Sequence, residues 1–184
     1  MMRKKPMLAY PVSDKPIDYT KPVFMQPKLD GVRCLIQYDG TESLVAYSRT
    51  GKVWKNINHI LYELIPFFKK YPNVILDGEL YNHALRDDFE KIISCVRKTK
   101  PTDADRAESR KLVQFHCYDI VDETLTFEER CKFVFDNLRD YYGVRTVPTI
   151  VTPTESQAKV NHARNLDSGY EGSILRTNDT YQCK

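Results

Sequence analysis

The residues from Lys28 to Arg33, "KLDGVR", bring a lysine, an aspartate, a glycine and an arginine together at the end of a strand-like run. A lysine amine is a nucleophile only when it is neutral, and its ordinary pKa is about 10.4. Neighbouring cations such as Arg33 or a metal ion, together with partial burial, would lower that pKa. Gly31 leaves the backbone bare, so a phosphate can lie close to it. The stretch therefore predicts that Lys28 attacks an electrophilic phosphorus.

Strand periodicity places the polar side chains around this lysine. Alternation along the strand puts Gln26, Lys28 and Asp30 on one face, with apolar residues on the other. In a later strand Asp77 and Glu79 share a face in the same way. In "FHCYDI" (115–120) the tyrosine and the aspartate point to opposite faces, and we expect the tyrosine to reach a pocket and the aspartate a turn. A surface lysine on an edge strand would have the same local sequence, so the interpretation depends on the whole set.

"KLDGVR" resembles the nucleotide-attachment motif of the covalent nucleotidyltransferases, which comprise ATP-dependent DNA ligases, RNA ligases and mRNA capping enzymes. In that superfamily the lysine takes AMP or GMP through a phosphoramidate bond, so the resemblance implies that Lys28 is the catalytic nucleophile. Further stretches resemble the family's motifs in the family's order: "SRTG" (48–51), "LDGEL" (76–80), "FHCYDI" (115–120), "FEER" (127–130) and "EGSILR" (171–176). The resemblance runs from residue 6 to residue 184.

The resemblance also implies roles for individual residues. Arg49 would handle the ribose or a phosphate of the nucleic acid, Glu79 would reach the ribose hydroxyls, and Tyr118 would stack on the base. Glu171 would help to hold Mg²⁺, with Asp30 as a second metal ligand. The full set of expected ATP-binding residues is Gln26, Lys28, Arg33, Arg49, Glu79, Tyr118 and Glu171.

The sequence departs from the family pattern at two places. Many members have glutamate two residues before the lysine, where this chain has Gln26; a glutamine oxygen still accepts from an adenine amino group, so ATP remains the expected nucleotide. The family's last motif, a lysine pair, would come just after Lys184, followed by a small oligonucleotide-binding barrel. We therefore expect an extended lead-in over residues 1–22 and an adenylation domain over residues 23–184, cut before the lysine pair and the barrel.

The order of predicted elements favours an α+β fold with mainly antiparallel sheets flanked by helices. Strands are predicted over residues 23–29, 33–39, 43–49, 73–80, 111–121, 146–152 and 172–177, with a hairpin turn at Asp39-Gly40. Helices are predicted over residues 58–71, 86–96, 127–142 and from 155 to Gly169, the last two opened by capping boxes at Thr126 and Thr154. The highly charged stretch 100–111 is predicted to be a surface excursion.

Composition limits the alternatives. The chain has 184 residues and a formal net charge of +3, which neither requires nor excludes a nucleic-acid partner. No apolar run approaches the roughly 18 residues of a membrane span. The five cysteines are scattered and form no Cys-x-x-Cys pair, which predicts free thiols in a reducing cytoplasmic or nuclear compartment and no secretion. The four histidines have no ligand-like spacing, so we expect no histidine metal site.

These observations lead to one expectation and several alternatives. We expect the adenylation domain of an ATP-dependent DNA ligase of the small viral or phage type, a monomer that uses ATP and Mg²⁺ on nicked double-stranded DNA. A capping guanylyltransferase also carries "LDGEL", but "EGSILR" resembles the ligase form, since capping enzymes tend to have aspartate there. An RNA ligase is a second enzyme alternative. A non-catalytic nucleic-acid-binding module with the same fold is the alternative from another class.

Overall fold

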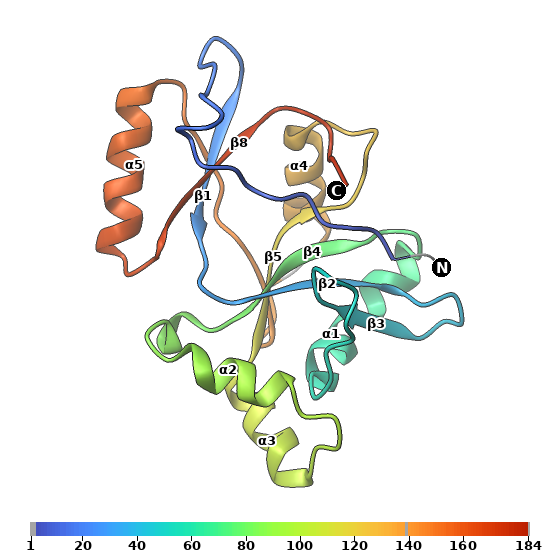
Figure 1. The fold of residues 1–184 in the computed structure, drawn as a ribbon. Helices are drawn as coiled ribbons and strands as arrows, with labels where there is room; N and C mark the ends of the chain where they lie inside the picture. Colours follow the sequence, from blue (N-terminus) through green and yellow to red (C-terminus); the bar gives the residue numbers. More distant parts are fainter. Residues whose placement is uncertain (1–2, 139, 184) are drawn as a thin grey trace.

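The computed structural model describes residues 3–138 and 140–183, which form two sheets and the helices around them (Figure 1). A three-stranded sheet has the order β7-β1-β8, and a five-stranded sheet has the order β3-β2-β4-β5-β6. The strands are β1 (Val23–Lys28), β2 (Val32–Tyr38), β3 (Leu44–Tyr47), β4 (Leu76–Tyr81), β5 (Gln114–Ile120), β6 (Val144–Thr146), β7 (Ile150–Val151) and β8 (Gly172–Thr177). All pairs are antiparallel except β5 with β6, which confirms the predicted α+β class with mainly antiparallel sheets.

The helices cover the sheets from outside. They are α1 (Asn58–Lys70), a short 3-10 turn η1 (His83–Leu85), α2 (Phe89–Val96), α3 (Asp103–Leu112), α4 (Phe127–Asn137) and α5 (Glu155–Asp167). The apolar faces of α1 and α2 join side chains of β2, β4 and β5 in one buried cluster, which holds the five-stranded sheet in place. Helix α5 lies along the three-stranded sheet (Figure 1). No described helix combines the length and the apolar character that crossing a membrane requires.

Several predicted elements differ from the structure. The strand predicted over residues 111–121 begins only at Gln114, because Lys111 and Leu112 belong to α3. The charged stretch 100–111 lies on the surface, as predicted, but most of it forms α3, whose Thr102 and Asp105 make a complete capping box. Its alanine, arginine, glutamate and lysine residues are good helix formers, so the helix forms although it buries little apart from Ser109. Helix α4 ends at Asn137 rather than at residue 142.

The predicted strand over residues 146–152 is divided between the two sheets. Residues up to Thr146 pair with β5 as β6, and Ile150 and Val151 pair with β1 as β7. Pro148 lies between the two parts and has no amide hydrogen for a strand ladder. The hairpin predicted at Asp39-Gly40 is present between β2 and β3, closed by the Asp39 amide donating to the Ser43 oxygen at 2.9 Å.

The two sheets meet where β1 passes into β2. Residues 29–31 connect the end of β1 in the small sheet with the start of β2 in the large one, so Lys28 lies close to the ends of β4 and β5. The N-terminal segment, which has neither helix nor strand over residues 3–22, runs across this junction and lies beside the C-terminal segment (Figure 1). Two bonds mark its path: the Arg3 guanidinium donates to the Gly51 oxygen, and the Met7 amide donates to the Tyr181 hydroxyl.

Candidate active site

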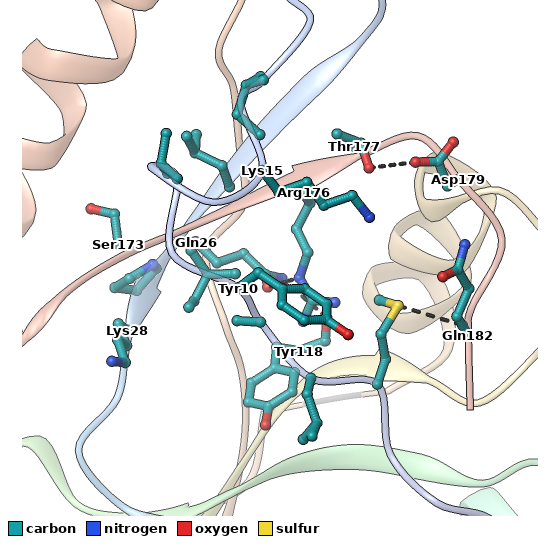
Figure 2. A pocket seen from close by; sticks show the side chains of 18 of the residues that line it. Tyr10, Lys15, Gln26, Lys28, Tyr118, Ser173, Arg176, Thr177, Asp179 and Gln182 are labelled. Carbon is teal, nitrogen blue, oxygen red and sulfur yellow. Dashed lines mark hydrogen bonds between the residues drawn. The ribbon is translucent and has the colours of Figure 1, made fainter. Parts of the chain in front are cut away.

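A cavity of about 380 Å³ lies at the junction of the two sheets (Figure 2). Its walls come from the N-terminal segment, from β1, from β8 and from the facing strands of the large sheet. Of the sequence-predicted residues it brings together Gln26, Lys28, Arg33, Glu79 and Tyr118. Local sequence patterns placed Gln26 and Lys28 on one strand and the other three residues on separate strands, and the crossing of the two sheets makes them neighbours.

Lys28 is at the mouth of this cavity. It is the last residue of β1 and pairs with Gly172 of β8, so the backbone fixes where its side chain begins. The side chain is half exposed, and its Nζ lies 3.5 Å from Oε1 of Glu171, the residue before β8. The amine is therefore accessible to a ligand and has a carboxylate beside it.

Glu79 and Tyr118 form a pair on the floor of the cavity. The Tyr118 hydroxyl donates to Glu79 Oε1 at 3.1 Å. Burial raises the pKa of Glu79 to about 8, although the charge of Arg33 and the bond from Tyr118 act in the opposite direction. Burial and the nearby Glu79 raise the pKa of Tyr118 well above 10, so the phenol stays neutral. A protonated Glu79 can donate a hydrogen bond to a ligand hydroxyl, which an ionised carboxylate cannot do.

Arg33 is held by a buried aspartate. Its Nε and Nη2 each donate to the Asp77 carboxylate at 2.7 Å, and Nη2 also donates to the Met7 oxygen at 2.9 Å. Burial opposes the charge of Arg33, but the Asp77 carboxylate outweighs it and raises the pKa of the guanidinium. Asp77 also accepts a bond from the Tyr181 hydroxyl at 2.7 Å. Arg33 therefore connects the N-terminal segment with the C-terminal one behind the cavity.

Gln26 is almost fully buried, and its amide group is engaged on both sides. Its Nε2 donates to the Tyr118 oxygen and to Thr149 Oγ1, each at 3.0 Å. Its Oε1 accepts from Arg176 Nε at 3.0 Å. These partners fix the orientation of the amide, because only the nitrogen can donate to a carbonyl oxygen. The oxygen keeps one lone pair for a ligand, and adenine recognition by Gln26 remains a prediction.

The sequence predicted that the Asp119 side chain faces a turn, and the structure shows that this prediction is wrong. Asp119 is fully buried and accepts from Arg130 Nε at 2.7 Å and from Arg176 Nη1 at 3.0 Å. The two guanidinium groups satisfy a carboxylate that would otherwise be costly to bury. Arg176 also lies over the Tyr118 ring, 5.3 Å from its centroid, and so backs the cavity floor.

The remaining predicted residues lie outside the cavity lining. Arg49 is exposed in the turn after β3, Asp30 is exposed in the loop between β1 and β2, and Glu171 is beside Lys28 at the rim. Gly31 packs closely on β4, since a Cβ there would lie 2.5 Å from the Leu80 oxygen. The bare backbone noted in the sequence therefore has a packing role.

The described residues contain no group of three or more histidines, cysteines or acidic residues placed to hold a metal ion. Mg²⁺ usually takes one or two carboxylates and shares substrate phosphates rather than filling a protein cage. Glu171 and Asp30 are the exposed carboxylates that flank Lys28 in the chain and in the β1–β8 pairing. They fit the expected role, and their binding of Mg²⁺ remains a prediction.

Several parts of the cavity wall were missed by the sequence interpretation, including Arg130 of α4 and residues 179, 180 and 182 of the C-terminal segment. The N-terminal segment contributes Met7, Leu8, Tyr10 and Lys15, and β8 contributes Arg176 (Figure 2). Arg176 is within "EGSILR", so the motif itself contained the signal. The N-terminal segment has no periodicity that could have marked it as a wall, and its position depends on the long-range bonds of Met7.

Solved structures of DNA ligases share the fold of this chain. The solved structure of the ATP-dependent DNA ligase from bacteriophage T7, a complex with ATP, matches with a TM-score of 0.67 and 15% identity over 98% of this chain and 64% of that one. A structure named "Pmar-Lig_Pre" matches with a TM-score of 0.74 and 22% identity over 98% of this chain and 44% of that one.

The family model described as "ATP dependent DNA ligase domain" matches residues 6–184, and the chain belongs to that family. This confirms the resemblance read from the motifs. A DNA ligase of African swine fever virus (isolate Tick/South Africa/Pretoriuskop Pr4/1996) is 27% identical over 161 residues, which are 85% of this chain and 36% of that protein. The chain thus spans little more than a third of the length of this relative.

Proposed function

We propose that this chain is the nucleotide-accepting part of an ATP-dependent DNA ligase that forms a lysyl-AMP intermediate at Lys28. The observation that carries the proposal is the position of this amine: half exposed, 3.5 Å from the Glu171 carboxylate, at the mouth of a cavity floored by Tyr118. A cavity of about 380 Å³ is within the range of small-ligand sites.

The first step forms a bond between the neutral Lys28 Nζ and the α-phosphorus of ATP and breaks the bond to pyrophosphate, which leaves with the electron pair, while the amine releases a proton to solvent. AMP then passes to the 5′-phosphate at a nick, and the neighbouring 3′-hydroxyl displaces AMP and seals the strand. Phosphoryl transfers of this type depend mainly on positioning and charge neutralisation. Bound at Glu171 and Asp30, Mg²⁺ would neutralise charge on the phosphate oxygens.

The chain's own residues account for the positioning. Tyr118, backed by the guanidinium groups of Arg33 and Arg176 at 5.4 and 5.3 Å from its ring centroid, offers an aromatic face for the base. Glu79, neutral over much of the physiological range, supplies a donor and an acceptor for the ribose hydroxyls. Glu171 holds the Lys28 amine in place before the reaction.

The other parts of the proposal concern the partner and the setting. We propose nicked double-stranded DNA as the substrate, with Arg49 as an exposed contact to its backbone. We also propose a monomer in a reducing intracellular compartment, which is supported by the free thiols of the described cysteines, including the buried Cys34, Cys95 and Cys117. Light scattering at several concentrations tests the monomer, and an oligomer that persists on dilution would contradict it.

The decisive experiment is intact-mass analysis of the full-length protein after incubation with ATP and Mg²⁺, followed by denaturation and peptide mapping. We expect one AMP adduct on Lys28, none in Lys28→Ala, and an undiminished adduct in Lys21→Ala, which removes an exposed lysine just before β1. An adduct formed only from GTP would reject the ligase in favour of a guanylyltransferase. Binding of nicked duplex without any adduct would reject the enzyme in favour of a binding module.

A second measurement tests whether the sealed nucleic-acid strand is DNA or RNA. The adenylated protein is mixed with nicked duplexes in which the interrupted strand is DNA or RNA, and the sealed product is quantified. We expect sealing of the DNA nick. Sealing of the RNA strand alone would replace the DNA ligase with an RNA ligase.

A further inference from the structure

His83 joins two parts of the chain that are far apart in sequence. It opens η1 directly after β4, and its ring stacks on Tyr170 with centroids 4.2 Å apart and planes inclined by 26°. Its Nε2 lies 2.7 Å from the oxygen of Ser168, and its Nδ1 lies 2.6 Å from the hydroxyl of Tyr81. The imidazole thus spans from the end of β4 to the turn between α5 and β8.

The partners define the proton on this ring. A backbone oxygen can only accept, so Nε2 must carry the hydrogen that is donated to Ser168. In the neutral ring Nδ1 is then the acceptor for the hydroxyl of Tyr81, whose ring is buried at the end of β4. Both ring nitrogens are therefore used, and Arg86 adds a bond from Nη1 to the His83 oxygen at 2.9 Å. The ring is held from both sides rather than loosely packed.

The stacked rings of His83 and Tyr170 lie next to the pair formed by Lys28 and Glu171. Tyr170 is followed at once by Glu171, whose carboxylate lies 3.5 Å from Lys28 Nζ. On the other side, Tyr81 is two residues after Glu79, so the two side chains lie on the same face of β4. The loop before β8 contacts the segment after β4 through His83 and also through Arg86, whose side chain lies against Gly169. By contrast, α5 packs on the small sheet, and the Lys28–Gly172 pair also belongs to the small sheet. His83 therefore helps to fix Glu171 relative to the strand that carries Glu79.

We propose that His83 is a positioning residue for the lysine-charging step, acting through Tyr170 on the Glu171 carboxylate. The expected effect on the rate rests on the proposed function. The contact by which His83 holds the loop before β8 does not depend on it. Without the imidazole, the loop 168–171 would keep its covalent connection to β8 and the packing of Arg86 against Gly169, but it would lose the ring stack on Tyr170 and the bond to the Ser168 oxygen. Displacements of an ångström at a reacting group are enough to cost large factors in rate.

The test uses the full-length protein and four variants. His83→Ala removes the link, and Tyr170→Ala removes it from the other side, so one of them remains informative if the other does not fold. His83→Gln can still donate an amide hydrogen to the Ser168 oxygen. The control His162→Ala removes a histidine of the same corner, whose partner Ser173 keeps a second bond from Asn165.

The first readout is the rate of AMP adduct formation at saturating ATP, measured together with the KM for ATP. We expect His83→Ala and Tyr170→Ala to lower the rate about tenfold or more with a KM within about twofold of wild type. His83→Gln should recover part of the rate, and His162→Ala should equal wild type. A rate within twofold of wild type in His83→Ala, or a loss expressed only in KM, overturns the proposal, since either would show that the histidine does not act on the reacting pair.

The second readout does not require activity. Hydrogen exchange of the amides over residues 168–172 is compared in the same variants, and we expect faster exchange in His83→Ala and Tyr170→Ala than in His162→Ala. Unchanged exchange there overturns the mechanical link. If wild-type protein forms no AMP adduct, the proposed function fails, whereas the exchange result still decides whether His83 holds the loop.

Discussion

Glu79 makes the stability of this protein depend on pH in a predictable direction. Burial raises the pKa of its carboxyl from an ordinary 4.5 to about 8 in the folded chain. Between these two values the folded state keeps a proton that the unfolded state has lost. The free energy of unfolding therefore falls as pH rises through this window, and the loss is complete above about pH 8.

The magnitude follows from the two values. The difference between 4.5 and about 8, at about 1.36 kcal/mol for each pKa unit, corresponds to at most about 5 kcal/mol. Effective dielectric constants near 20 describe even buried sites, so we expect a smaller effect of about 2 kcal/mol. Glu79→Gln replaces the protonated acid by a neutral group of the same shape that still accepts from the Tyr118 hydroxyl, and it has no titration in this range.

The assay is urea unfolding of wild type and Glu79→Gln at several pH values between about 5 and 9. We expect the variant to gain stability relative to wild type by about 2 kcal/mol across that range. Comparison within each pH removes the contribution of other groups, such as His116, whose pKa burial lowers to about 4. Glu90→Gln, which removes an exposed carboxylate of α2, is the matched control. If the free energy of unfolding of Glu79→Gln differed from that of wild type by the same amount at every pH, the reasoning would be refuted.

Three further changes test the fold around the site. Gly78→Ala should destabilise by about 3 kcal/mol, because its Cβ would lie 2.2 Å from the His116 oxygen; an unchanged urea midpoint would contradict the packing. Arg33→Lys keeps the charge but loses the bidentate bond to Asp77, so unfolding should become easier by about 2 kcal/mol and the amides of the N-terminal segment should exchange faster. Thr126→Ala removes the cap of α4 and should cost about 1 kcal/mol in thermal or urea unfolding, whereas Thr126→Ser should cost much less.

Local sequence was sufficient for much of the fold. Alternating strands and the turn residues at Asp39-Gly40 predicted the β2–β3 hairpin, and Thr126 with Glu129 predicted the start of α4, since both signals come from residues close in the chain. The end of α4 could not be predicted in this way. The segment after Asn137 must turn back to bring Val144 beside β5, and that requirement is not contained in the helix's own residues.

The sequence by itself determined which residues are candidates for the chemistry, because their types and order in the motifs are local properties. Only the tertiary structure decided what each of them does when no ligand is bound. Arg33 holds Asp77, Gln26 holds Tyr118 and Arg176, and the N-terminal segment closes a wall of the cavity. Each of these contacts joins residues dozens of positions apart, and their energy depends on burial and geometry that exist only after the two sheets have come together.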